Sequence, residues 1–486
     1  MFALNNLSAL LTNRGRMQQA AKLLGRALRI SPDSHQLLIN FGRMSLHAGD
    51  AEAAAEAFRK VIGLQPDLAD AHSNLLACLN YLSNQDPARV FAEHRRWYER
   101  HASALRQFRR WNNPPDAQRR LRVGYVSPDL CEHSVARFLE PVFLEHDRER
   151  FEIACYADVP HPDATTARLR QLCARWSGTS GLSHEQLAQR IHEDRVDILV
   201  DLAGHTANNR LLAFARKPAP LQVSWLGYPN TTGLPSIDYR LTDARADPPG
   251  MTEALHTETL VRLPESFLCY RCPEDAPDVG SLPSGVTGGI TFASFNNLAK
   301  MTPEVIRVWS GILRAVPGSR LLLKSRASGD QDVRHRLIAL FTSMGARDEQ
   351  VVFHDPVPAH RDHMAAYNQV DIALDTFPYN GTTTTCEALW MGVPVICLAG
   401  QVHAARVGVS LLTQVGLANL VAPDEQSYIA SAVRLSQDPG GLAAIRGQLR
   451  ETMRNSSLCD ASGFTRALEQ VFRDTWSDWC RVQAQA

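Results

Sequence analysis

The stretch DIALDTFPYNGTTTTCEALWMGVPVICLA, from Asp371 to Ala399, determines how the second half of this chain folds. Its two ends, DIALDTF and VPVICLA, have the length and apolar content of buried strands, and CEALWMG between them is typical of a helix. Four threonines, Thr382–Thr385, precede that helix, although threonine is a mediocre helix former because its branched side chain is stiff. The succession of strand, polar turn, helix and strand predicts one βαβ unit of a parallel sheet.

The threonines in this unit predict a site for an anion. The first turn of a helix has N–H groups without partners in the helix, and it lies at the positive end of the helix dipole. Hydroxyl groups beside these N–H groups suit a phosphate, and Asn380–Gly381 permits its close approach. Glu387, on the same helix, can accept two hydrogen bonds from a ribose. The alternatives are a simple N-cap for the threonines and a dipole-complementing acid for Glu387.

Strands alternate with helices on both sides of this unit. The segments ITFASFN, SRLLLKS and QVVFHDPV precede it, with PEVIRVWSGILRAV as a helix among them. Before them, residues 275–289 are rich in Gly, Pro and Ser and are predicted to be a linker. An earlier series begins with LRVGYVS and includes FEIACYA, VDILVDLAG and LQVSWLGY. We therefore expect two α/β halves with a cleft between them and ligands beyond the carboxyl ends of their strands.

The first 82 residues contain a repeat with a period of 34 residues, which is that of the tetratricopeptide repeat. Small, apolar and proline positions recur in this register: Gly15 and Gly49, Ala20 and Ala54, Leu24 and Phe58, Pro32 and Pro66. Asn6, Asn40 and Asn74 extend it into a third, partial repeat. Fewer than three repeats are marginal alone, so we expect this block to lean on the next part of the chain, and the register leaves room for repeats upstream of Met1.

Composition excludes several classes of protein. The 486 residues are 44% hydrophobic and carry a formal net charge of zero, which argues against a nucleic-acid binder or a polybasic membrane protein. No apolar stretch is long enough to span a bilayer, and the N-terminus lacks the features of a signal peptide. Ten cysteines with a single C-x-x-C, Cys269 and Cys272, fit a reducing compartment. We expect a cytoplasmic protein with no membrane or nucleic-acid partner, and a solvated connecting helix in the arginine-containing stretch 86–111.

Several long segments resemble one family. The polar loop, the helix with Glu387 and ALWMGVPV resemble the nucleotide-sugar site of GT-B glycosyltransferases. The segments GYVSPDLCEHSVARFL, DLAGHTANNR, WLGYPNTTGLPSIDY, SFNNLAK and DTFPYNGTTTTCEAL, with the repeats, resemble the protein O-GlcNAc transferase family, which includes the plant SPINDLY proteins. Several are closer to SPINDLY, and the long insert of the animal enzymes is absent.

The resemblance implies an α/β GT-B fold, in which two Rossmann-like domains face a cleft, preceded by an all-α tetratricopeptide segment. The expected domains are repeats at 1–82, a helical linker at 83–118, an acceptor-side domain at 119–280, and a nucleotide-sugar domain at 288–486 that includes a C-terminal helix.

The resemblance also implies roles for residues on the nucleotide-sugar side. SFNNLAK supplies Asn297 and Lys300, both aimed at the diphosphate, and a cation there stabilises the leaving group. The other expected contacts are Thr382, Thr383 and Thr384 for phosphate, Glu387 for ribose, and Pro358, Ala359, His360 and His363 for the base. His360 replaces a basic residue of the animal relatives, and an arginine usual near Ala366 is absent, which leaves the identity of the base open.

On the acceptor side, His133 in DLCEHSV matches a histidine that lines the cleft in the family. It is either the general base or a histidine that contacts sugar or supports the structure. His205 in DLAGHT follows a strand end and is a candidate for lining the acceptor or sugar site. No metal is expected, because neither HRDH (residues 360–363) nor the D-x-D at 330–332 lies after an apolar strand, and Lys300 can supply positive charge.

The implied function is an inverting, metal-independent protein O-glycosyltransferase without a cofactor. It would move a sugar from a nucleotide sugar to Ser or Thr of a protein or peptide acceptor held by the repeats. UDP-GlcNAc is the usual donor of the family, and the SPINDLY resemblance makes GDP-fucose the alternative. Two other hypotheses stay open: a repeat scaffold with a decayed catalytic half, and a transferase that acts on small molecules or glycans.

Overall fold

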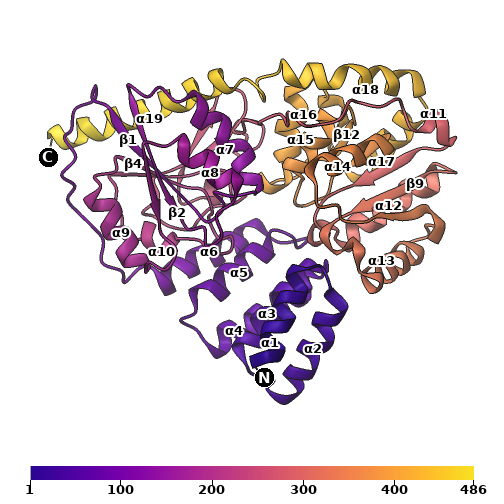
Figure 1. Cartoon of the computed structure of the whole chain (residues 1–486), viewed down its shortest axis with the longest axis horizontal. Coiled ribbons are helices and arrows are strands. Elements are labelled where there is room, and N and C mark those ends of the chain that lie inside the picture. The colour runs from indigo at the N-terminus through magenta and orange to yellow at the C-terminus, as the bar shows by residue number, and fades with distance from the viewer. Residues whose placement is uncertain (1, 486) are drawn as a thin grey trace. The chain divides into compact units, whose positions relative to one another are not determined.

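Figure 1 shows the computed structural model, which describes residues 2–485. The described chain divides into two compact units, each built from two separate segments. Unit 1 combines the residues up to Gln85 with Cys272–Ser456, and unit 2 combines Asp86–Arg271 with the residues from Ser457 onward. The repeats therefore belong to the same unit as the second α/β half.

The repeats fold as antiparallel pairs of helices that stack side by side (Figure 1). The helices are α1 (Phe2–Asn13), α2 (Met17–Ile30), α3 (His35–His47), α4 (Ala51–Leu64) and α5 (Ala69–Leu79). Gly15 and Gly49 lie in the turns within the two pairs with φ of +75° and +83°, a conformation that favours glycine. Ala20 and Ala54 are fully buried between helices. The predicted helical repeats are confirmed.

The turns of the repeats pack on the α/β part of unit 1. A Cβ added to Gly15 would lie 2.6 Å from the carbonyl oxygen of Arg326, and one at Gly49 would lie 2.9 Å from that of Leu298. These close approaches place both repeat turns directly against the backbone of the α/β part of the unit. The repeats lean on the α/β fold, as their small number predicts.

The sheet of unit 1 has six parallel strands within residues 2–485, in the order β10-β9-β8-β11-β12-β13. They are β8 (Thr291–Ser294), β9 (Arg320–Lys324), β10 (Val351–His354), β11 (Ile372–Leu374), β12 (Val395–Leu398) and β13 (Val421–Ala422). The helices of this part are α11 (Ser284–Thr287), α12 (Pro303–Ala315), α13 (Gln331–Ser343), α14 (His360–Ala365), α15 (Thr383–Trp390), α16 (Val407–Gln414), α17 (Glu425–Ser436) and α18 (Pro439–Arg454). Strand order reverses between β8 and β11, because the chain builds outward from β8 in both directions.

The sheet of unit 2 has seven parallel strands in the described chain, in the order β3-β2-β1-β4-β5-β6-β7. They are β1 (Leu121–Ser127), β2 (Phe151–Ala157), β3 (Arg175–Gly178), β4 (Ile198–Asp201), β5 (Leu221–Ser224), β6 (Tyr239–Asp243) and β7 (Thr259–Leu263). Its helices are α6 (Pro87–His101), α7 (Ser134–Glu145), α8 (Ala164–Gln171), α9 (His184–Glu193), α10 (Leu211–Phe214) and α19 (Ala461–Gln485). Strand order reverses between β1 and β4.

The C-terminal helix corrects the predicted domain division. Helix α19 was expected in the second α/β domain, yet it packs on unit 2 beside α7 (Figure 1). Phe464, Leu468, Phe472 and Trp476 are buried in the core that also holds strands β1 and β2. These four positions form one face of the helix, so their spacing predicts that the helix packs through this face. The spacing does not predict which of the two α/β halves the face packs against.

The predicted helical linker is helical only in its first part. Helix α6 ends at His101, and residues 102–118 form no helix or strand. The backbone N–H of Phe108 donates to the carbonyl of Arg216 (2.8 Å), and the Trp111 indole N–H donates to that of Lys217 (3.2 Å). These bonds hold residues 102–118 as a strap on unit 2. Among the helices of the described chain, none is both long and apolar enough to cross a bilayer.

Candidate functional site

Two polar segments meet at the point where strand order reverses in unit 1. Residues 295–300 follow β8, and the turn that ends in the threonines, 375–385, follows the neighbouring β11. Ligands of open α/β sheets bind at such a point, beyond the carboxyl ends of the strands. The topology thus brings the two predicted phosphate-binding motifs together.

The carboxylate of Asp375 organises the turn before α15. Its Oδ1 accepts the N–H groups of Gly381 (2.6 Å) and Thr376 (2.9 Å), and Asn380 Nδ2 donates to the carbonyl of Thr376 (2.9 Å). A Cβ at Gly381 would lie 2.7 Å from Thr384 Oγ1, so a larger residue would disturb the threonines. The turn is therefore preformed by buried hydrogen bonds.

The threonines occupy the start of α15 as predicted. Helix α15 begins at Thr383, and within residues 2–485 the side chain of Thr382 makes no capping hydrogen bond. This excludes the simple N-cap alternative for Thr382. Thr384 Oγ1 donates to Asn296 Oδ1 (2.9 Å), and Thr382–Thr384 are half-exposed. The N–H groups of this first turn have no acceptor inside the helix, which suits an anion.

Lys300 reaches this turn from the segment after β8. It ends a short 3₁₀ helix (Leu298–Lys300), and its Nζ donates to the carbonyl of Asn380 (2.7 Å). Asn297, predicted to face the diphosphate, instead caps this short helix by accepting the N–H of Ala299. Its buried neighbour Asn296 contacts the threonine turn. A lysine ammonium and the start of a helix therefore converge on one place.

The repeats contribute an aromatic ring to the same place. The ring of Tyr379 lies under the Lys300 ammonium, with 4.0 Å between Nζ and the ring centre. Tyr81, which follows α5, lies against Tyr379 with 5.0 Å between ring centres. Tyr379 is thus held between a repeat side chain and the lysine, and the repeats help to position Lys300.

We expect Tyr81→Ala to weaken the binding of a nucleoside diphosphate by about 2- to 10-fold, because an aromatic pair contributes about 0.5–1.5 kcal/mol. Tyr81→Phe should bind like the unmodified protein, since the phenyl ring keeps the stack. Isothermal titration with UDP and GDP measures both. If Tyr81→Ala binds the nucleoside diphosphate as tightly as the unmodified protein does, the repeats do not help to position Lys300.

Burial shifts the pKa values of Lys300 and Asp375 toward each other. Burial lowers the pKa of Lys300 to about 8, although the Asp375 carboxylate opposes the shift. Burial raises the pKa of Asp375 to about 6, although the N–H of Gly381 and the charge of Lys300 oppose it. The ammonium and the carboxylate therefore coexist between about pH 6 and pH 8.

We expect the affinity for a nucleoside diphosphate to fall about tenfold per pH unit above about pH 8, where Lys300 loses its proton. The affinity falls as the pH rises because only the protonated lysine attracts the anion. Lys300→Arg should keep its affinity to higher pH, since arginine stays charged. Titrations from pH 7 to pH 10 test this, and a flat profile for the unmodified protein would contradict the role of the lysine.

A second group of predicted residues surrounds Glu387, which is 5% exposed on α15. His363 Nε2–H donates to Glu387 Oε2 (2.8 Å), and Lys324 Nζ donates to His363 Nδ1 (2.5 Å). His360 Nε2 lies 3.8 Å from Glu387 Oε1. The structure thus unites three predicted residues, and the contact with His363 gives Glu387 a role beyond complementing the dipole.

Pro358 and Ala359 are exposed in the loop that leads into α14, which begins at His360. Lys324 is the residue that sequence reasoning missed in this group. It stands at the carboxyl end of β9 and is 7% exposed. The sequence did contain a signal for it, because a charged residue ends an apolar strand there. Ligands bind beyond the carboxyl ends of parallel strands, which is the rule that located the threonine turn.

His133 lies at the reversal point of the other sheet, between β1 and α7. It caps α7, and the N–H of Val135 donates to His133 Nδ1 (3.3 Å). A neutral His133 therefore carries its proton on Nε2 and presents a donor there. With its side chain 46% exposed, this geometry favours a residue that contacts a ligand over a general base.

His205 does not line an open site in unit 2. Its side chain is fully buried, and its Nε2–H donates to the carbonyl of Thr232 (2.9 Å). The ring of Trp97 on α6 packs edge-on against it at 4.9 Å. The prediction failed because α6 covers the loop after β4, which the local sequence does not reveal.

The two segments considered for metals have structural roles. Asp330 caps α13 and accepts the N–H of Gln18, and the histidines of HRDH contact Glu387 and Lys324. Within residues 2–485, no three or more His, Cys, Asp or Glu side chains are grouped as metal ligands. Lys300 supplies the positive charge at the threonine turn.

Comparison with known proteins matches both α/β halves to one family. The model of "Glycosyl transferase family 41" matches residues 100–271 and 281–468. A relative from Oryza sativa subsp. japonica, "Probable UDP-N-acetylglucosamine--peptide N-acetylglucosaminyltransferase SPINDLY", is 45% identical over 435 residues, which are 89% of this chain and 47% of the relative. A second relative, from Arabidopsis thaliana, is named "Probable UDP-N-acetylglucosamine--peptide N-acetylglucosaminyltransferase SEC". It is 34% identical over a region that covers 75% of this chain and 38% of the relative. The chain spans about half the length of the curated relatives it matches.

A solved structure extends the likeness to the whole fold. The structure of a lysine-to-methionine mutant of the Thermobaculum terrenum O-GlcNAc transferase superposes with a TM-score of 0.94 at 40% identity. The match covers 99% of this chain and 91% of that one, repeats included. Since the expected GT-B architecture is confirmed and the family model covers both halves, the protein belongs to glycosyl transferase family 41.

Proposed function

We propose that this protein transfers a sugar from a nucleotide sugar to serine or threonine hydroxyls of proteins. The observation that carries the proposal is the convergence of Lys300 and the start of α15 at the reversal point of the unit 1 sheet. Membership of glycosyl transferase family 41 supports it. A scaffold that had lost its activity would not require a preformed anion site with a partly buried lysine.

The donor side has what departure of a nucleoside diphosphate requires. As the bond between the sugar and the phosphate breaks, negative charge grows on the leaving phosphate oxygen. The Lys300 ammonium and the N–H groups of Thr383 and Thr384 would stabilise this charge from fixed positions. The acceptor hydroxyl attacks the anomeric carbon from the opposite side, so the configuration inverts. The hydroxyl proton passes to water or a phosphate oxygen, because His133 presents a donor.

The repeats support a peptide as the acceptor. Asn6, Asn40 and Asn74 occupy the same repeat position, and Asn40 Nδ2 donates to Asn5 Oδ1 (2.7 Å). An asparagine side chain has a donor and an acceptor, as a peptide bond does, so a row of asparagines suits an extended chain. The relatives' names also include the word peptide.

UDP-GlcNAc is the donor we propose first, because the relatives at 43–45% identity carry it in their names. GDP-fucose is the alternative, and one contact favours it. Asp275 Oδ1 lies 3.5 Å from His360 Nδ1, beside the predicted base-binding loop. A carboxylate there can accept the N1–H and N2–H groups of guanine, which uracil does not offer.

Thermal shifts with the two donors test the proposal. Ligand present at 100 times its Kd stabilises a protein by about 2.7 kcal/mol, which raises the melting temperature by several degrees. We expect this rise with UDP-GlcNAc, together with transfer to a serine-containing peptide. A rise with GDP-fucose alone would assign the guanine nucleotide. No rise with either donor would leave the repeat scaffold as the explanation.

A further inference from the structure

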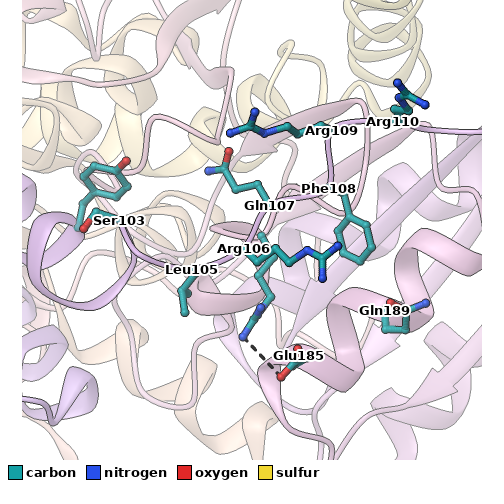
Figure 2. Close-up of a pocket in the computed structure, with 11 residues that line it drawn as sticks. Ser103, Leu105, Arg106, Gln107, Phe108, Arg109, Arg110, Glu185 and Gln189 are labelled. Carbon is teal, nitrogen blue, oxygen red and sulfur yellow. Dashed lines mark ion pairs between the residues drawn. The ribbon is translucent and has the colours of Figure 1, made fainter.

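Unit 2 has a pocket of about 840 Å³ that the proposed transfer reaction does not use (Figure 2). The strap after α6 forms one wall, and the start of α9 and the segment after α10 form the other. Four arginines line it, Arg106, Arg109, Arg110 and Arg216, against the single carboxylate of Glu185. Figure 2 shows Arg106, Arg109 and Arg110 projecting from successive parts of the strap.

The positive charge of the pocket is largely uncompensated. Within residues 2–485, the guanidinium groups of Arg106, Arg109 and Arg110 make no hydrogen bond or ion pair. Arg216 lies 3.7 Å from Glu185, the pair joined by the dashed line in Figure 2, and Glu185 is 74% exposed. The Nε of Arg216 is buried without a hydrogen-bond partner in the described chain. Four cationic groups thus share one carboxylate, although the whole chain has no net charge.

The strap that carries three of these arginines is firmly attached. The ring of Phe108 stacks on His192 of α9 with 4.1 Å between ring centres, and its N–H donates to the carbonyl of Arg216. Gln107 Nε2 donates to the carbonyl of Ala215 (3.1 Å). The two anchored residues therefore lie between Arg106 and Arg109 in the sequence, which limits the entropy lost when the arginines bind a ligand.

The chemistry of the pocket points to carboxylates as the ligand. The planar guanidinium group binds a carboxylate through two parallel hydrogen bonds, and a concave positive surface concentrates anions. Nucleic acid fits less well, because a phosphate backbone needs a basic track over many nucleotides, whereas these arginines line a single pocket. The volume is enough for several side chains of a peptide.

We propose that this arginine pocket binds an acidic segment of the protein acceptor, rich in aspartate and glutamate. The inference rests on the proposed function, because it takes the acceptor to be a protein. It adds a substrate class: proteins with an acidic segment apart from the serine or threonine that is modified. The pocket then selects acceptors by charge, without contacting the reacting hydroxyl.

The test measures binding rather than turnover. A fluorescent ten-residue peptide of alternating Asp and Glu, without Ser or Thr, is titrated with the full chain at low salt. We expect the triple variant Arg106→Gln, Arg109→Gln, Arg110→Gln to bind about tenfold more weakly, because it loses three ion pairs that are each weak at an exposed position. Glu185→Gln removes the only carboxylate and should bind about twofold more tightly.

The control removes three exposed arginines of the same unit outside the pocket: Arg170→Gln, Arg190→Gln and Arg466→Gln. It should bind the acidic peptide like the unmodified protein. Equal affinity of the pocket variant and this control would overturn the inference. So would equal binding of a peptide of Asn and Gln, or stronger binding of a ten-nucleotide uridine RNA, which would indicate a nucleic-acid site.

Two readouts separate this inference from the proposed function. The pocket variant should keep the thermal shift with UDP-GlcNAc or GDP-fucose, which also shows that it folds. Lys300→Met should lose sugar transfer to a serine-containing peptide and still bind the acidic peptide. If no donor binds the unmodified protein but the peptide does, the transferase proposal fails and the arginine pocket stands as a peptide site. If the donor binds and the peptide does not, only the pocket inference fails.

Discussion

Lys300→Met should lower the rate of sugar transfer by about 10²–10³-fold, the usual loss when one fixed group that stabilises a developing negative charge is removed. The methionine side chain fills similar space and can still pack on Tyr379, so the fold should persist. What it lacks is the ammonium that donates to the carbonyl of Asn380 at the threonine turn. Single-turnover rates with saturating donor and a serine-containing peptide measure this loss.

Lys60→Met is the matched control for that measurement. Lys60 lies in the repeats of the same unit, 45% exposed, and pairs with Asp33 at 3.0 Å. Its replacement removes the same charge away from the threonine turn and should leave the rate unchanged. A Lys300→Met rate within threefold of the control would take Lys300 out of the mechanism.

Glu387→Gln should weaken donor binding by about 10- to 100-fold, because hydrogen bonds to a charged group contribute about 1.5–3 kcal/mol. The amide keeps the shape of the side chain but loses the charge that holds His363 and Lys324. If Glu387 binds the ribose, the KM for donor rises while kcat changes little.

Glu349→Gln provides the comparison for this second prediction. Glu349 is an acid of the same unit that is 65% exposed and pairs with Arg347 on the surface. Donor titrations of both variants should differ by at least tenfold. If Glu387→Gln binds the donor as tightly as Glu349→Gln does, Glu387 has only a structural role.

Sequence patterns located the site because the relevant groups follow apolar strands. The threonine turn comes directly after β11 and the Lys300 segment directly after β8, and the rule that ligands bind beyond strand ends needs no further information. The 34-residue register likewise identified the helix pairs, since each repeat carries the same small residues at its turns.

Contacts between distant segments could not be predicted in the same way. Adjacent asparagines at 296 and 297 have the same local preferences, and only the folded sheet decides that Asn296 contacts Thr384. Tyr81 and Tyr379 contact each other although the whole segment Asp86–Arg271 lies between them in the sequence. His205 follows a strand, as the residues of the candidate site do, but α6 covers it.

The missed strands lack an apolar run for a physical reason. Strand β3 (RWSG) lies at the edge of its sheet and is partly exposed, so it needs no continuous hydrophobic side. Strand β6 (YRLTD) contains Arg240, which is buried with its guanidinium donating to the carbonyl of Tyr228. A hydrogen bond from a buried arginine to the carbonyl of a distant residue cannot be read from the local sequence.

The proposed function depends most on how the leaving group binds, and a crystal structure of the protein with UDP or GDP shows this at once. We predict the terminal phosphate within hydrogen-bond distance of Lys300 Nζ and the N–H groups of Thr383 and Thr384, with Glu387 on the ribose. A diphosphate bound elsewhere, with Lys300 still donating only to the carbonyl of Asn380, would refute this binding mode.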